Sequence, residues 1–230
     1  MDNLMLIENN FHYPAILKLK GKKCVIVGGG QVAARKLVTL CEAGAEVTVV
    51  APELGAELLK EAEKHSWQLI KDYYKAEYFQ QAFIVIAATN DAAINRQITD
   101  AAPLLCNNIT EPELSNFTVP SSFTQGDITV ALATGGMPAF TRMLKKRLQE
   151  VITPDIASFN DFLRQQRHIV QQISSTPAQR TALWRQILTD DLINLVAAGH
   201  AAQAKENILD AISSFRSQSQ NGPRWDPRAF

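Results

Sequence analysis

Three consecutive glycines carry the clearest chemical signal in this sequence. Gly28, Gly29 and Gly30 follow a β-rich run at residues 23–27 and precede a helical pattern at residues 32–43. The order fits G-x-G-x-x-A, which binds the pyrophosphate of a dinucleotide when it joins a strand to a helix. The first glycine permits the tight turn, the second lets the backbone approach the phosphates, and the helix N-terminus offers free amides. We therefore predict dinucleotide binding at Gly28 and Gly30, with a ligand-free turn as the alternative.

The end of the second predicted strand bears on the choice between NAD and NADP. Dinucleotide-binding domains usually carry an acidic residue there, which binds the ribose hydroxyls. This sequence instead reads Val49-Val50-Ala51-Pro52, and Glu53 is the nearest acid. No basic residue follows this strand to receive a 2′-phosphate, so the sequence favours NAD.

Strand and helix patterns alternate over the first hundred residues. Such alternation predicts an α/β fold with a Rossmann-type parallel sheet and crossover helices. The apolar run FIVIAA at residues 83–88 is typical of a strand covered on both faces. Asn90 is placed to cap the helix that follows. The strand candidates are residues 23–27, 46–50, 68–70, 83–88 and 104–106, and the helix candidates are residues 32–43, 54–65 and 92–101.

The pattern changes after Asn107. Two short strand candidates at residues 117–119 and 128–133 precede a helical remainder. Thr153 and Thr176 each stand before a proline, an arrangement typical of a helix start. The short strands leave exposed edges, which a second copy of the chain would cover in a homodimer.

The sequence thus divides into three expected parts. An NAD-binding Rossmann domain is expected at residues 1–112 and a small α+β dimerisation region at residues 113–150. A helical C-terminal domain is expected at residues 151–230, with a flexible tail from Ser217. The division follows the change from alternating strands and helices to helices alone.

Composition and charge exclude several classes of protein. The 23 basic and 23 acidic residues balance, so no overall field favours nucleic acid. Three cysteines without CxxC spacing are expected to be buried thiols, and four scattered histidines give no metal-site spacing. No apolar run has membrane-spanning length and the acidic, polar N-terminus does not resemble a signal peptide, so a cytoplasmic location is expected.

Several segments resemble one known family. YPAILKLKGKKCVIVGGGQVAARK, EAGAEVTVVAPE, FIVIAATND, LLCNNITEPELSNFTVPS and ITVALATGGMPAFTRMLKKRLQE are similar, in this order, to the precorrin-2 dehydrogenase / siroheme synthase N-terminal family. The resemblance covers about residues 12–150. It implies NAD-dependent oxidation of precorrin-2 to sirohydrochlorin, and insertion of ferrous iron in some members. Longer members add a methyltransferase domain, which this chain is expected to lack because it ends too soon.

The resemblance also implies site residues. By motif position, two pairs would contact NAD: Gln31 with Val32, and Pro52 with Glu53. Thr89 and Asn90 end the fourth strand, where an open α/β sheet places its ligand crevice. On the substrate side, Thr134 matches a serine that is phosphorylated in some members, and Gly135 follows it. Arg142 and Lys146 belong to a basic cluster, which is either a solvated helix face or a site that attracts tetrapyrrole carboxylates.

One position departs from the family pattern. The family's acid–base aspartate lies three residues after the asparagine that matches Asn107, and this chain has Thr110 there, followed by Glu111. The resemblance thus implies a catalytic loop with Asn107, Thr110 and Glu111. Three alternatives stay open: Glu111 takes the role, water or substrate carboxylates take it, or activity is reduced or lost. The last alternative would leave an NAD-binding sensing or regulatory module. A different small-molecule dehydrogenase on the same fold also stays open.

Overall fold

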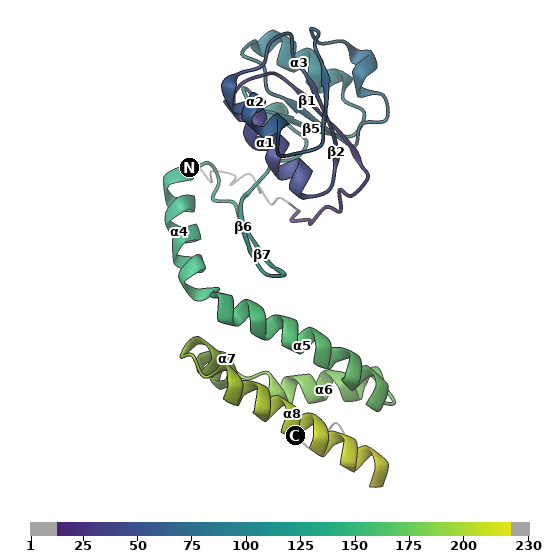
Figure 1. Cartoon of the computed structure of the whole chain (residues 1–230), viewed down its shortest axis with the longest axis vertical. Coiled ribbons are helices and arrows are strands. Elements are labelled where there is room, and N and C mark those ends of the chain that lie inside the picture. The colour runs from purple at the N-terminus through teal and green to yellow at the C-terminus, as the bar shows by residue number, and fades with distance from the viewer. Residues whose placement is uncertain (1–12, 222–230) are drawn as a thin grey trace, which may run out of the picture. The chain divides into compact units, whose positions relative to one another are not determined.

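The computed structural model describes residues 13–221, which form two compact units (Figure 1). The first unit ends at Val119 and the second begins at Pro120. Among the described residues, no helix is both long and apolar enough to cross a membrane.

The first unit is built on a parallel five-stranded sheet. Its strand order is β3-β2-β1-β4-β5, which is the order of a Rossmann fold up to its fifth strand. This order and the helices between the strands confirm the predicted fold class. The strands are β1 (Lys23–Val27), β2 (Glu46–Val50), β3 (Gln68–Ile70), β4 (Ile84–Ala87) and β5 (Leu105–Asn108).

Helices cover both faces of this sheet. The helices α1 (Gln31–Glu42) and α2 (Ala56–Ala62) pack on one face, where Ile26 and Val49 point. Helix α3 (Ala92–Ala101) and the short 3₁₀ helix η1 (Ala76–Phe79) pack on the other. A second 3₁₀ helix, η2 (Pro112–Leu114), follows β5. Coverage on both faces explains why the strands are continuous apolar runs in sequence.

The second unit combines a hairpin with five helices. The strands β6 (Ser121–Gln125) and β7 (Ile128–Leu132) pair antiparallel. Its helices are α4 (Pro138–Val151), α5 (Pro154–Ile173), α6 (Pro177–Ile187), α7 (Asp190–Ala197) and α8 (Ala201–Asn221). The apolar core of the unit lies among α5, α6, α7 and α8. Helix α8 continues through residues 217–221, the first part of the tail that was expected to be flexible. Residues 222–230 of that tail lie outside the described residues.

Helix caps confirm two predictions and correct a third. The hydroxyls of Thr153 and Thr176 accept backbone N–H groups at the starts of α5 and α6, as predicted. The predicted Asn90 cap is wrong, because Asp91 caps α3 by accepting from the amides of Ala93 and Ile94.

The strand predicted at residues 117–119 is also wrong, since the hairpin begins at Ser121. Side chains explain the difference. The Asn116 amide oxygen accepts from Cys106 N at 2.8 Å, and the Asn107 amide nitrogen donates to Phe117 O at 3.3 Å. These bonds attach the segment to the end of β5 without a regular strand ladder.

Candidate functional site

The first glycine of the turn is required by the protein's own packing. Gly28 directly follows β1, and its N–H donates to Val50 O at 2.9 Å. Its φ of +130° lies in a region that favours glycine. A Cβ atom there would stand 2.2 Å from Ala88 O, so the turn runs against the end of β4.

The second glycine joins the turn to the loop after β2. A Cβ atom at Gly29 would stand 2.0 Å from Glu53 O, and the Gly55 N–H donates to Gly29 O at 2.9 Å. The predicted cofactor residues Pro52 and Glu53 therefore lie beside the glycine turn, and both are exposed.

The third glycine is different, because no described protein atom requires it. A Cβ atom at Gly30 would meet nothing within 4 Å among the described residues. Gly30 is the N-cap of α1, and no described side chain caps this helix. Gln31 is exposed and Val32 half-buried in the first turn. Open space before uncapped helix amides fits a dinucleotide pyrophosphate, in chemistry and in room.

A buried asparagine links the ends of β4 and β5. Asn95, on α3, is fully buried. Its amide oxygen accepts from Thr89 N at 3.1 Å and from the Thr89 hydroxyl at 2.7 Å. Its amide nitrogen donates to Thr89 O at 3.0 Å and to the Thr110 hydroxyl at 3.1 Å. The predicted residues Thr89 and Thr110 thus share one partner, while Asn90 is exposed beside them.

The Thr110 hydroxyl both accepts and donates in this network. It accepts from Asn95 and donates to the Asn108 amide oxygen at 2.9 Å. The same oxygen of Asn108 accepts from the backbone N–H groups of Thr110 and Glu111, each at 3.0 Å. Asn108 therefore fixes the loop after β5, and the Thr110 hydroxyl connects Asn108 to Asn95.

Glu111 is held by an arginine of α3. Arg96 Nε donates to one Glu111 oxygen at 2.7 Å, and a second guanidinium nitrogen bonds the other oxygen. This two-pronged contact lowers the pKa of Glu111, with the Arg96 hydrogen bond as the largest cause. A carboxylate so stabilised is a weaker base than a free one.

Asn107, the third predicted catalytic residue, has a separate environment. It is buried, and its amide nitrogen bonds Phe117 O. Consecutive strand residues point to opposite faces, so Asn107 and Asn108 lie on opposite sides of β5. The structure brings Asn107, Thr110 and Glu111 to the same strand end, where they have different partners.

The predicted substrate residues belong to the second unit. The Thr134 hydroxyl donates to Met137 O at 3.2 Å and contacts the Thr141 hydroxyl. Gly135 is exposed, with a φ of +56°. Arg142 and Lys146 are exposed one turn apart on α4. Their substrate role stays a prediction.

The thiols and histidines offer no metal site within the described residues, where no three potential ligands gather. Cys24 and Cys106 are buried free thiols, and burial raises the pKa of Cys24 to about 11. Such thiols are poor nucleophiles at neutral pH.

Sequence reasoning missed the residues that position this site. Asn95 and Arg96 lie on α3, and Asn108 ends β5. One signal was present: Asn95 stands three residues before the core residue Ile98, which places a polar side chain on the buried helix face.

The fold and the glycine turn define a class, the Rossmann-type nicotinamide dinucleotide-binding proteins. A family described as NAD(P)-binding matches residues 15–121, and the sirohaem synthase dimerisation region matches residues 156–212.

Individual relatives narrow the class further. Siroheme synthase of Nitrosospira multiformis is 38% identical over 84% of this chain and 42% of its own length. Siroheme synthase of Methylobacillus flagellatus is 32% identical over 91% of this chain and 45% of its own length. The chain belongs to the siroheme synthase N-terminal domain family. It spans less than half the length of these relatives.

A solved structure shares the fold. SirC, a precorrin-2 dehydrogenase, superposes with a TM-score of 0.70 and 24% identity, over 88% of this chain and all of that chain. The similarity extends beyond the Rossmann unit, since that unit ends at Val119.

Proposed function

We propose that this chain is an NAD-dependent dehydrogenase that oxidises precorrin-2 to sirohydrochlorin in siroheme biosynthesis. The observation that carries the proposal is the open space at Gly30 before the uncapped N-terminus of α1. Family membership and the names of the relatives, siroheme synthase and precorrin-2 dehydrogenase, support the choice of reaction.

The chain's own residues bind and orient the reactants in this proposal. The amides at the start of α1 hold the pyrophosphate, and the loop at Glu53 lies on the ribose side. Thr89 and the Asn107–Glu111 loop border the space for the nicotinamide. Bound NAD supplies the hydride acceptor for a substrate ring carbon, while a proton leaves the macrocycle.

The proton that leaves the macrocycle needs an acceptor. The Thr110 hydroxyl already has a donor and an acceptor, and Arg96 holds Glu111 with a lowered pKa. Both observations favour water or the substrate's own carboxylates as proton acceptor.

Substitutions at the loop test this route. We expect Glu111→Gln to keep turnover within about threefold of wild type, whereas loss of a true acid–base group costs about a hundredfold or more. The matched control is Glu113→Gln, an exposed carboxylate two residues away. A hundredfold loss in Glu111→Gln alone would assign the proton to Glu111. Thr110→Asp is expected to raise turnover or leave it unchanged.

The whole reaction is tested by absorption spectroscopy. Purified full chain mixed with NAD and precorrin-2 should develop the spectrum of sirohydrochlorin. Some members of the family also insert ferrous iron, and ferrous iron added to the same mixture tests this chelatase activity. NAD binding without turnover would contradict the proposal and favour a sensing module.

NAD rather than NADP is the proposed cofactor, and the sheet register supplies a sharper test. Val50 pairs with Ile70 at the carboxyl ends of β2 and β3. The residue after each strand therefore lies at the same edge of the sheet, which places Lys71 next to Ala51. Sequence alone did not reveal this basic residue near the end of β2. NAD should bind more tightly than NADP to wild type, and Lys71→Ala should weaken NADP alone. Tighter binding of NADP to wild type would reverse the assignment.

A homodimer completes the proposal. The region that matches the family's dimerisation region, residues 156–212, lies in the helical part of the second unit. The hairpin β6–β7 also offers a half-exposed apolar face. We propose that both contribute to the subunit contact, while Thr134, Gly135, Arg142 and Lys146 contact the tetrapyrrole.

A further inference from the structure

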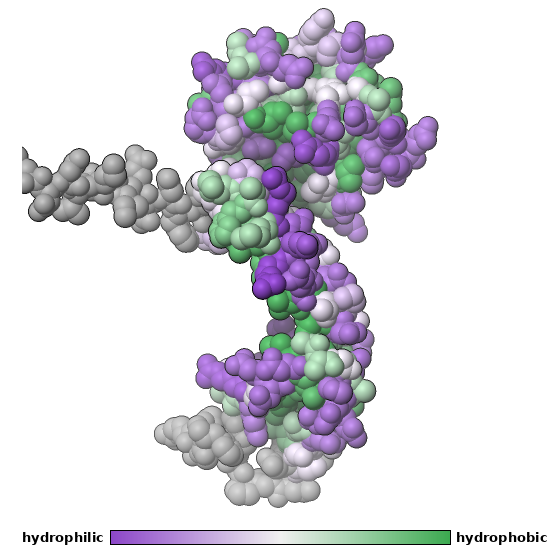
Figure 2. Space-filling view, turned by 90° about the vertical axis from the view of Figure 1, so that its left-hand side faces the viewer, coloured by the Kyte–Doolittle hydropathy of each residue, from purple (hydrophilic) through white to green (hydrophobic). Residues whose placement is uncertain are grey.

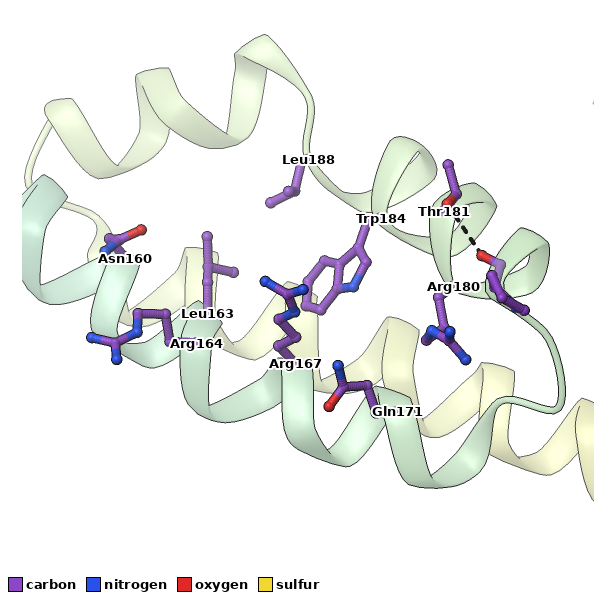
Figure 3. Close-up of a pocket in the computed structure, with 10 residues that line it drawn as sticks. Asn160, Leu163, Arg164, Arg167, Gln171, Arg180, Thr181, Trp184 and Leu188 are labelled. Carbon is purple, nitrogen blue, oxygen red and sulfur yellow. Dashed lines mark hydrogen bonds between the residues drawn. The ribbon is translucent and has the colours of Figure 1, made fainter. Parts of the chain in front are cut away.

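A groove of about 490 Å³ lies between α5 and α6 in the second unit (Figure 3). Its lining residues run from Asn160 to Leu188, inside the region at residues 156–212 that matches the family's dimerisation region. This groove is therefore part of the proposed subunit contact. A more specific signal lies in the first unit, at the loop after β5.

In that loop, the Thr110 hydroxyl lies between the amides of two buried asparagines, Asn95 and Asn108. The backbone of Thr89 fixes the orientation of the Asn95 amide. A backbone N–H can only donate, so the amide atom 3.1 Å from Thr89 N is the oxygen. A carbonyl can only accept, so the atom 3.0 Å from Thr89 O is the nitrogen. The Asn95 nitrogen therefore donates to the Thr110 hydroxyl, at 3.1 Å.

The Asn108 amide is fixed in the same way. Its oxygen accepts the backbone N–H groups of Thr110 and Glu111, each at 3.0 Å. This oxygen carries no proton and lies 2.9 Å from the Thr110 hydroxyl, so the hydroxyl donates to it. Neither asparagine amide can turn over, since its nitrogen would then face a backbone N–H.

The Thr110 hydroxyl consequently has one hydrogen-bonding capacity left, and its polarity is known. A hydroxyl has one proton and two acceptor lone pairs. Among the described residues, Asn108 takes the proton and Asn95 takes one lone pair. Thr110 is exposed, so the second lone pair is open to a ligand. Only a group that donates a hydrogen bond can bind there.

The place of Thr110 in the sheet indicates which donor it binds. In a Rossmann-type fold the dinucleotide crosses the sheet where the strand order reverses, which is between β1 and β4 here. The glycine turn and Glu53 lie on the β1–β2 side, where the adenosine half is expected. The nicotinamide half is then expected over β4 and β5, where Thr110 is linked through Asn95 to Thr89.

We propose that the Thr110 hydroxyl accepts a hydrogen bond from the carboxamide NH₂ group of the nicotinamide. This group is the hydrogen-bond donor of the nicotinamide ring, and it matches the acceptor that remains on Thr110. The bond fixes the rotation of the ring and thus selects the face that receives the hydride. The inference rests on the proposed dinucleotide site and assigns Thr110 to cofactor orientation rather than to proton transfer.

Calorimetry of the full chain with two dinucleotides tests the proposal. The probes are NAD and 3-acetylpyridine adenine dinucleotide, in which a methyl group replaces the carboxamide NH₂. Wild type should bind NAD about fivefold more tightly, because one neutral hydrogen bond is lost with the second probe. Thr110→Val should bind both probes equally, whereas Thr110→Ser keeps the hydroxyl and should keep the preference. The matched control is Thr118→Val, an exposed threonine that should also keep it.

The loop should survive the removal of the hydroxyl, because Asn108 still accepts the backbone N–H groups of Thr110 and Glu111. Hydrogen exchange at these two amides checks this. If Thr110→Val loses that protection, the smaller variant Thr110→Ala repeats the measurement with the same expected result.

Equal binding of both probes by wild type would overturn the inference, as would a preference that persists in Thr110→Val and Thr110→Ala. Turnover of precorrin-2 without the preference would contradict this inference alone. The preference without turnover would contradict the proposed dehydrogenase alone and leave the role of Thr110 in place.

Discussion

The Rossmann unit and the hairpin–α4 segment, residues 121–151, bury their side chains to very different extents. Every residue of β4 is buried, and so are four of the five residues of β1. Within the described hairpin no residue of β6 or β7 is buried, and among the residues of α4 only Thr141 is. On the face of the first unit that Figure 2 shows, hydrophilic side chains predominate.

This difference indicates which part of the chain is self-sufficient. A five-stranded sheet covered on both faces has its own core, and α5 to α8 enclose a second one. A two-stranded hairpin is marginally stable without further packing. Exposed Met137 at the N-cap of α4, with exposed Phe140 and Met143 on the helix, adds apolar surface to the hairpin–α4 segment. The segment therefore needs another surface, for which a second copy of the chain is our proposal.

The largest effect is expected at the glycine that packing requires. Gly28→Val should prevent folding of the first unit, since its Cβ would overlap Ala88 O and its φ is unfavourable for valine. Hydrogen exchange should then show loss of protection in β1 and β4 and retained protection in α5 and α8. Equal loss in both units would break the comparison between a self-sufficient first unit and a separately folded helical core.

Gly30→Val, two residues away, should have the opposite profile. The melting temperature should stay near wild type, because a side chain at position 30 meets no described protein atom. NAD affinity should fall by about a hundredfold or more, because the side chain occupies the space where the pyrophosphate approaches the backbone. Calorimetry showing unchanged affinity would remove the proposed site.

Truncation of core and surface side chains should separate the two regions by stability. Leu37→Ala on α1 should lower the free energy of unfolding by about 2–5 kcal/mol, since Leu37 is fully buried. Met143→Ala on α4 should change it by less than about 0.5 kcal/mol in dilute, monomeric protein. Urea unfolding measures both, and similar losses would contradict the contrast.

A charge on the hairpin should sharpen the comparison. Val130 lies on the half-exposed apolar face of β7, and Thr129 lies on the exposed opposite face. Val130→Asp should weaken dimerisation by about tenfold or more, because it would bury an unpaired charge at the contact. Thr129→Asp is the control. Sedimentation that finds both variants dimeric would place the subunit contact elsewhere.

The smallest effect concerns acid stability of the first unit. Lys75, Tyr78 and the N–H of Tyr73 bond Asp72 and lower its pKa to about 2, with the Lys75 hydrogen bond the largest cause. Because the pKa of Asp72 is lower in the folded than in the unfolded state, its ionised carboxylate stabilises the fold above about pH 4. This stabilisation is lost as the pH falls toward 2. In the variant Asp72→Asn, the free energy of unfolding should change less with pH in that window than it does in the wild type. An unchanged slope would contradict the shift.

Sequence patterns predicted the elements whose signals are local. The strands β1, β2 and β3 match their predicted limits. For β1 and β2 the signal is a β-rich run that lies close to glycine or proline on both sides. The helix caps Thr153 and Thr176 were predictable because a proline follows each of them at the first helical position. The strand predicted at residues 117–119 failed because side-chain bonds from Asn107 and Asn116 replaced regular pairing.

The candidate site was predictable only where it follows the chain. The glycine turn and the strand ends were found from order and spacing. The link from Thr89 through Asn95 to Thr110 joins three elements, and no spacing in the sequence encodes it. The pairing of Arg96 with Glu111 and the position of Lys71 likewise depend on strand register and helix placement.

The bond between Gly29 and Gly55 has a further consequence for the kinetics of ligand capture. The glycine turn and the loop after β2 are in backbone-to-backbone contact. Neither segment can move away without breaking the hydrogen bond between Gly55 N and Gly29 O. Because this contact fixes both loops before a nucleotide arrives, little conformational entropy should be lost on binding. Association should then be a single diffusional step, without the slow phase that loop closure would add.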